Sequence, residues 1–199
     1  LGRPEEAEPA VRKALDLDAA HLGAGTTLAN LLLNRGELDA ARDVLAQFES
    51  TGAPHILVAL AAIACKQGRI DDADRFVTRA IAHSPRHVLA RLTAARIADV
   101  RGYPKAAHMQ LEAAYSFAPT IPEVLARIDA MRMRDEADAL FEKGDMKAAL
   151  EILVAALKHD PEDPLIHLRL AKALEHFGDA QRTEESRTRA FTLAPSLNN

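Results

Sequence analysis

The sequence contains no tryptophan, and aromatic residues make up only 4% of its 199 residues. Its hydrophobic content is nevertheless 48%, so most of its apolar side chains are those of alanine and leucine. Strands favour β-branched and aromatic residues, whereas alanine and leucine are strong helix formers. The shortage of aromatic residues therefore favours a protein built of packed helices.

Three further absences exclude whole classes of protein. The single cysteine excludes an internal disulfide framework, and no spacing of cysteine and histidine resembles a zinc site. No hydrophobic run approaches the roughly 20 residues that a membrane-spanning helix requires. The net charge is −4 with acidic and basic residues interspersed, so no basic footprint for nucleic acid is visible. We therefore expect neither a membrane span nor nucleic-acid binding.

What the sequence does contain is a repeated interval of small residues. In "KQGRIDDADRFVTRAIAHSP", Gly68 is followed by an alanine after five residues, a second alanine after seven more and a proline after a further five. Gly102 comes 34 residues after Gly68 and begins the same series. The series recurs, complete or in part, after Gly2, Gly36, Gly144 and Gly178. Six matches in register indicate an internal repeat.

The spacing is that of a helix hairpin. Each glycine follows an apolar helical stripe, which is typical of the C-terminal end of a helix. Two alanines seven residues apart lie on one face of the next helix, where small side chains let two helices approach closely. The proline cannot continue that helix and ends it. The interval therefore predicts helix pairs that stack.

A 34-residue helix–turn–helix with these positions resembles the tetratricopeptide repeat (TPR) family. The resemblance covers nearly the whole chain and implies an all-α fold, a right-handed superhelical solenoid of antiparallel helix pairs. Residues 1–199 are predicted to form a single solenoid with these parts: a half repeat at 1–21, repeats at 22–53, 54–87 and 88–121, an insertion at 122–129, and repeats at 130–163 and 164–197. The bulky residue usual at the fourth repeat position is Leu57 and Met133, but only Gly25, Arg91 and His167 elsewhere.

The insertion at 122–129 arises because one glycine interval is eight residues too long. Gly102 and Gly144 are 42 residues apart, where the repeat requires 34. Pro122 suits the first turn of a helix, and no glycine or further proline intervenes before Gly144. We therefore predict one helix over about 122–143.

Two questions about this long helix stay open in the sequence. Its early apolar residues Val124, Leu125 and Ile128 either pack on the preceding helix or form an exposed apolar surface that docks a partner or a second copy. A break near residues 132–134, giving a separate short helix, is the alternative geometry.

The sequence shows no constellation of catalytic or metal-binding residues. His83 and His87 are four residues apart, but Pro85 lies between them, so no single helix presents both. No HExxH motif and no glycine-rich phosphate loop after a predicted strand is present. We therefore expect no metal, no cofactor and no enzymatic activity.

The resemblance to the TPR family implies a protein or peptide ligand, bound in a concave groove that is lined by the first helix of each repeat. Transferring the family's groove positions to this sequence gives the candidate partner-binding residues Asn30, Asn34, Val58, Ala62, Lys66, Leu92 and Arg96. Lys66 and Arg96 favour an acidic or C-terminal segment. Of the residues with which chaperone-binding members grip a terminal carboxylate, only Asn30 has a counterpart, so we expect no chaperone tail as partner.

The leading hypothesis is a scaffold for protein–protein interaction, part of a larger bacterial protein. One alternative is a self-assembly module that forms homo-oligomers through its N-terminal edge or the insertion at 122–129. Another is a docking or regulatory domain of a larger enzyme. The sequence begins with Leu1 rather than methionine, so we expect an upstream segment. A cytoplasmic location is favoured and a periplasmic one is the alternative.

Overall fold

The computed structural model describes residues 4–198, and within this range the chain forms eleven α-helices, two short 3-10 helices and no strand. The first three residues of the predicted half repeat lie outside the described residues. The α-helices are α1 (Pro4–Leu17), α2 (Leu22–Asn34), α3 (Leu38–Ala46), α4 (Pro54–Lys66), α5 (Ile70–His83), α6 (Val88–Val100), α7 (Pro104–Phe117), α8 (Pro122–Glu142), α9 (Met146–His159), α10 (Pro164–His176) and α11 (Ala180–Leu193). The 3-10 helices are η1 (Glu49–Thr51) and η2 (Pro195–Asn198).

The regularly spaced glycines end helices, as the sequence predicts. Gly68 has φ = 72°, and Gly102 has φ = 79°, a left-handed conformation that glycine adopts without steric cost. After Gly68, the backbone N–H of Arg69 donates to the carbonyl of Ala64 at 2.8 Å, which satisfies a carbonyl at the end of α4. The turn reverses the chain, so that α5 runs back along α4.

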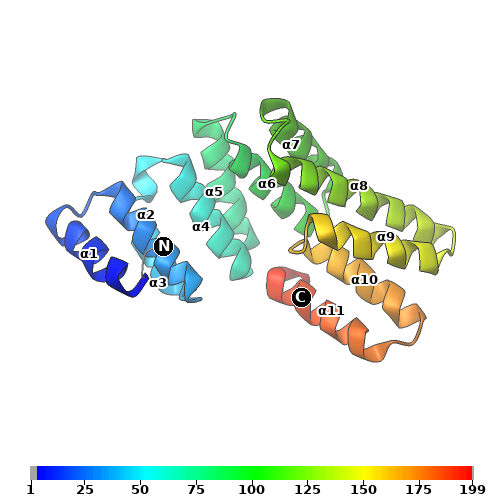
Figure 1. The fold of residues 1–199 in the computed structure, drawn as a ribbon. Coiled ribbons are helices and arrows are strands. Elements are labelled where there is room, and N and C mark those ends of the chain that lie inside the picture. The colour runs from blue at the N-terminus through cyan, green and yellow to red at the C-terminus, as the bar shows by residue number, and fades with distance from the viewer. Residues whose placement is uncertain (1–3, 199) are drawn as a thin grey trace.

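The evenly spaced alanines are the contact points between paired helices. Ala73 and Ala80 of α5 are completely buried, with 0% of their surface exposed. Their counterparts in the other second helices are buried too: Ala41, Ala107, Ala114, Ala149, Ala156 and Ala190. The pairs α2–α3, α4–α5, α6–α7, α8–α9 and α10–α11 pack closely, and they stack into a right-handed superhelical solenoid (Figure 1).

The prediction of one long helix after residue 121 is confirmed. Helix α8 has 21 residues, whereas α10 and α6 have 13 each. Its N-terminal turns extend over the preceding pair, where Val124 and Ile128 are buried in one apolar cluster with Leu111 of α7. The extra turns therefore pack on the array, and of the three apolar residues Val124, Leu125 and Ile128 only Leu125 is exposed, at 40%.

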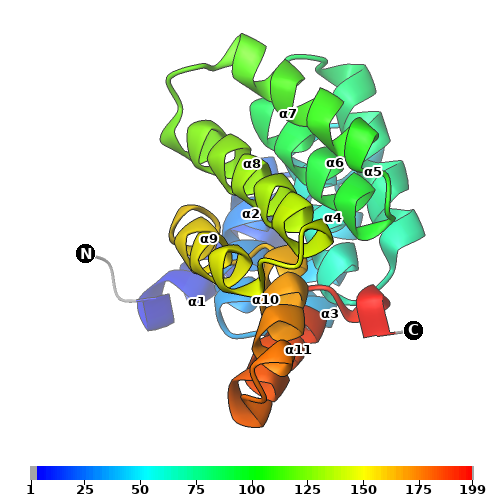
Figure 2. The same cartoon turned by 90° about the vertical axis from the view of Figure 1, so that its right-hand side faces the viewer.

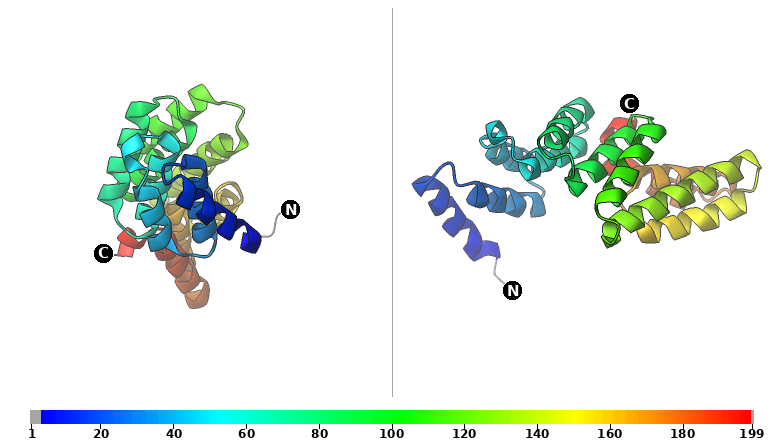
Figure 3. Two further views of the ribbon diagram at one scale, coloured as in Figure 1. Left: turned by 90° about the vertical axis from the view of Figure 1, so that its left-hand side faces the viewer. Right: turned by 90° about the horizontal axis from the view of Figure 1, so that it is seen from above.

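The solenoid curls so far that its C-terminal end meets its middle. Helix α10 packs against α6. The segment after α11 lies on the turn between α4 and α5, where a Cβ placed on Gly68 would be 3.4 Å from Cβ of Pro195. Figure 1 shows the end of α11 beside the turn between α4 and α5, and Figures 2 and 3 show α1 at the far edge of the array. The concave face is therefore enclosed between the N-terminal repeats and the last helix pair.

Candidate functional site

A cavity of about 450 Å³ lies on the concave face, between the N-terminal repeats and α11. Helices α2 and α4 and the start of α3 form one side of it, and α11 contributes a single residue. Its lining residues are Leu33, Asn34, Gly36, Leu38, Ala62, Ile63, Lys66 and Thr192. The cavity therefore depends on the curl of the solenoid, which brings α11 to the first helices.

Three of the seven predicted binding residues meet in this cavity. Asn34 is the last residue of α2, and Lys66 is the last residue of α4, so the two occupy equivalent positions of successive repeats. Ala62 lies one helical turn before Lys66 and is exposed. Asn30 is exposed one turn before Asn34 and does not line the cavity.

Val58 and Leu92, two of the predicted partner contacts, are buried and do not line an accessible groove. The side chain of Val58 is 4% exposed, and that of Leu92 is 1% exposed. The transferred positions assume that this side of each first helix faces solvent. Here α6 packs against that side of α4, and the extra turns of α8 place Val124 in the same apolar cluster as Leu92.

Arg96, the seventh predicted residue, belongs to a charged pocket deeper in the concave face. Its Nη2 atom lies 3.2 Å from Oδ2 of Asp160, which follows the end of α9. The pocket is formed where α6, α8 and the start of α10 meet, and its charged residues are Arg96, Asp99, Arg127, Asp160 and Asp163. Arg96 is therefore half-buried and engaged, rather than free on the surface.

Beside this pocket, Arg134 of α8 holds three first helices together. Its side chain is only 3% exposed. Nη2 donates to Oδ1 of Asp99 on α6 at 2.9 Å, and Nη1 donates to Oδ2 of Asp163 at 3.1 Å. Burial opposes the charge of the guanidinium, but the carboxylates of Asp163 and Asp99 outweigh it and raise the pKa of Arg134. The residue is fully ionised and anchors α8 between its neighbours.

Asp163 has a second role at the start of α10. Its Oδ1 atom accepts hydrogen bonds from the backbone N–H groups of Leu165 at 2.8 Å and Ile166 at 3.3 Å. An aspartate followed directly by proline is a typical helix start, so this cap could have been found in the sequence. The contact of the same carboxylate with Arg134 could not, because it joins residues 29 positions apart.

The TPR family model matches residues 1–53 and 140–185, which include α1 to α3 at one end and α9, α10 and the start of α11 at the other. Three of the glycine turns and three of the buried alanines described above lie in these ranges: Gly36, Gly144 and Gly178, and Ala41, Ala149 and Ala156. The chain is a tetratricopeptide repeat protein.

Two curated relatives are similar to this TPR protein over most of its length. "Cellulose synthase 2 operon protein C" of Komagataeibacter xylinus is 31% identical over 149 residues, which are 74% of this chain. "Cellulose synthase operon protein C" of Pseudomonas fluorescens (strain SBW25) is 28% identical over 144 residues, which are 69% of this chain. The chain spans only 11% of the length of each.

Among solved structures, that of YrrB, described as "a TPR protein with an unusual peptide-binding site", has a similar fold. The TM-score is 0.54 at 15% identity, and the match covers 94% of this chain and 93% of YrrB. At this identity the likeness concerns the fold alone.

Membership of the TPR family limits the functions that the chain is expected to have. The fold is in general a scaffold for protein–protein interaction and is typically not catalytic. Among residues 4–198, no group of three or more histidine, cysteine or acidic side chains could hold a metal ion. None of the helices described here combines the length and the apolar character needed to cross a membrane.

Proposed function

We propose that this TPR protein binds a peptide or helical segment of a partner protein along its concave face. The observation that carries the proposal is the cavity of about 450 Å³, in which Asn34, Ala62 and Lys66 meet opposite Thr192. Its volume lies within the range of about 300–1,000 Å³ that is typical of ligand pockets. Residues from both ends of the array would therefore contact the same ligand.

The cavity offers the chemistry that a polypeptide segment needs. The amide of Asn34 both donates and accepts hydrogen bonds, so it can hold a peptide N–H or C=O group. Leu33 and Ala62 supply apolar contact, and the ammonium group of Lys66 favours an acidic residue in the ligand. Asn30, exposed one turn earlier on α2, extends the polar surface along which a longer segment could lie.

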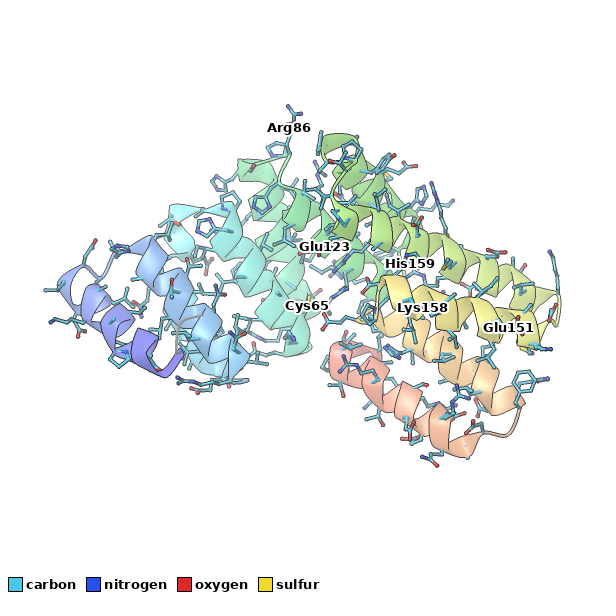
Figure 4. The ribbon with its side chains drawn as sticks, viewed as in Figure 1. Cys65, Arg86, Glu123, Glu151, Lys158 and His159 are labelled. Atoms are coloured by element: carbon cyan, nitrogen blue, oxygen red, sulfur yellow. The ribbon has the colours of Figure 1, made fainter. Side chains whose placement is uncertain are left out.

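The experiment begins with selection of binding peptides from a random display library against the immobilised chain. The affinity of a selected peptide is then measured by fluorescence anisotropy for the parent and for Asn34→Ala/Lys66→Ala. Loss of two hydrogen-bonding groups should weaken binding at least about tenfold. The matched control is Lys147→Ala/Glu151→Ala, which removes two exposed polar side chains from α9 (Glu151 is labelled in Figure 4).

Two results would count against the proposal. Selected peptides that bind the parent and the Asn34/Lys66 variant equally well would place the binding site elsewhere. The same conclusion would follow if cross-links from the bound peptide fell on the second helices α5, α7 and α9 rather than on α2, α4 and α11. Circular dichroism spectra of all variants should coincide, because the substituted side chains are exposed.

A second proposal concerns the larger protein in which the module works. Both curated relatives are named for cellulose synthase operons, and they match 69% and 74% of this chain. We infer that the module serves as a docking scaffold within a protein of polysaccharide synthesis. Deletion of the gene should lower the cellulose recovered from cells, and an unchanged yield would refute this assignment.

A further inference from the structure

Two arginines of the charged pocket share one carboxylate. Arg96 of α6 places Nη2 3.2 Å from Oδ2 of Asp160, and Nε of Arg127 of α8 lies 3.8 Å from the same oxygen. The other nearby acid, Glu123, is 4.0 Å from Arg127 and is itself largely exposed. Among the described residues, Arg127 therefore has no carboxylate oxygen within hydrogen-bond distance.

Arg127 is nevertheless well covered by protein. Its side chain is 18% exposed, and its hydrogen bond to the backbone carbonyl of Leu92 is long, at 3.5 Å. Burial lowers the pKa of Arg127, and the positive charge of Arg96 lowers it further, because both disfavour the charged guanidinium. Arg134, two turns further along α8, is in the opposite situation, because it donates hydrogen bonds to two carboxylates.

The charges of the pocket are thus divided unevenly. One side holds two guanidinium groups and the carboxylate of Asp160, which leaves one positive charge in excess. The other side holds Arg134 between Asp99 and Asp163, which leaves one negative charge in excess. The excess charges of the two sides sum to zero, but they lie at different places in the pocket. The surface around Arg127 and Arg96 therefore attracts an anion.

The free space beside Arg127 limits the size of that anion. The pocket has about 20 Å³ of free volume, close to the roughly 10–15 Å³ that one water molecule needs. One carboxylate oxygen fits this space, whereas the oxygen atoms of a phosphate do not all fit. The pocket also adjoins the peptide-binding face, because α6, which carries Arg96, packs against α4, which carries Ala62 and Lys66.

We propose that the pocket binds the carboxylate of an aspartate or glutamate side chain, presented by the partner segment and paired with Arg127 and Arg96. The inference rests on the proposed function, since the segment would have to lie on the concave face. In the free protein, Asp160 takes the place of this carboxylate, but it comes within hydrogen-bond distance of Arg96 only and not of Arg127. An arriving carboxylate would form the charge-assisted hydrogen bonds that Arg127 lacks.

A small probe tests this pocket without the partner. N-acetylglutamate α-amide carries a carboxylate only on its side chain, and N-acetylglutamine α-amide is its neutral isostere. Each is titrated into the intact chain while the Nε–Hε signals of Arg127 and Arg96 are followed by NMR. We expect a saturable shift of both signals with the carboxylate and none with the amide. Methyl phosphate should bind more weakly, because it exceeds the free space.

Three variants make the test specific. Arg127→Gln removes the guanidinium that lacks a close carboxylate and should lower the affinity for the carboxylate probe about tenfold. Arg132→Gln, on the same helix and 73% exposed, is the control and should leave the affinity unchanged. Asp160→Asn removes the internal competitor and should tighten binding several-fold, which no merely structural role of Asp160 would produce.

The outcomes separate this inference from the proposed function. Absence of a saturable shift with the carboxylate, or equal shifts with the neutral amide, would overturn the inference and leave the peptide cavity at Asn34 and Lys66 untouched. Equal affinity of the parent and Arg127→Gln would overturn it as well. The comparison of the two probes on the parent chain keeps the test decisive even if Arg127→Gln does not fold.

Discussion

The aromatic ring of Phe48 lies directly against the backbone of Gly25. A Cβ placed on Gly25 would be 2.1 Å from Cε2 of Phe48, closer than two carbon atoms can approach. Gly25 is buried, and Phe48 is only 3% exposed. The ring therefore fills the space at the fourth repeat position, where the family usually carries a bulky side chain.

This contact predicts opposite effects for two glycines of α2. Gly25→Ala should destabilise the fold by about 1–3 kcal/mol, because the added methyl group overpacks the site against a buried ring. Gly23→Ala should be neutral or stabilise by up to about 1 kcal/mol, because it only reduces the freedom of the unfolded chain; its Cβ would lie 3.4 Å from His21, an ordinary contact. Urea unfolding measures both. Stabilisation by both substitutions would show that Phe48 can move aside.

The buried alanine stripe predicts a second pair of effects. Ala80 of α5 is 0% exposed, so Ala80→Leu should cost about 1–3 kcal/mol by overpacking. Ala82, two residues further on, is exposed, so Ala82→Leu should change stability by less than about 0.5 kcal/mol. The two variants are compared by thermal unfolding. Since repeat arrays depend on neighbour interfaces, the loss at Ala80 should appear as a lower midpoint for the whole array.

Asp99 predicts a pH dependence of stability. Burial raises its pKa above the usual value of about 4, although the charge of Arg134 opposes the shift. Asp163 adds to the increase, and Arg169 opposes it. A raised pKa means that the folded state holds this proton more tightly than the unfolded chain does. The contribution of Asp99 to stability should therefore fall as the pH rises from about 4 through the raised pKa.

Asp99→Asn removes this titration and serves as the reference. The free energy of unfolding of the parent minus that of the variant should decrease as the pH rises from about 4 through the raised pKa of Asp99. Urea midpoints at several pH values measure it. A difference that grows in favour of the parent over this range would show that the ion pair with Arg134 outweighs burial.

The start of α8 predicts where self-association could occur. Leu125 is 40% exposed beside a cavity of about 260 Å³, which Tyr115 and Ile128 also line, whereas Val124 is 0% exposed. Leu125→Asp should therefore change the free energy of unfolding by less than about 1 kcal/mol, while Val124→Ala should cost about 1–3 kcal/mol. If the chain forms homo-oligomers through residues 122–129, Leu125→Asp should lower the sedimentation coefficient at high concentration. An unchanged concentration dependence would exclude this surface.

Much of the fold could be read from the sequence because the repeat uses local chemistry. A glycine at Gly68 or Gly102 ends a helix through its own φ angle, and a proline ends one through its missing N–H. Alanines seven residues apart mark a helix contact whatever the rest of the chain does. The long helix α8 could be predicted in the same way, because no glycine or proline lies between Pro122 and Gly144.

The candidate site could be predicted from the sequence only in part. Asn34 and Lys66, which the repeat positions single out as candidates, both line the cavity because both end a first helix at the same repeat position. The burial of Val58 and Leu92 could not be predicted, because the position of a residue on its own helix does not reveal which neighbouring helix covers it. Arg127 was overlooked, since it lies in the insertion and has no repeat position to identify it.

By itself, the sequence determined the helices, their pairing and the direction in which they stack, because each depends on residues within one 34-residue unit. Only the tertiary structure decided how far the array curls, and therefore that Thr192 faces Lys66 and that Pro195 rests on the turn at Gly68. The physical reason is that curvature adds up small rotations between neighbouring pairs. The additional turns of α8 contribute to this curvature, and so do the contacts of Arg134 with Asp99 and Asp163. No single repeat encodes the curvature, because it depends on how several repeats pack together.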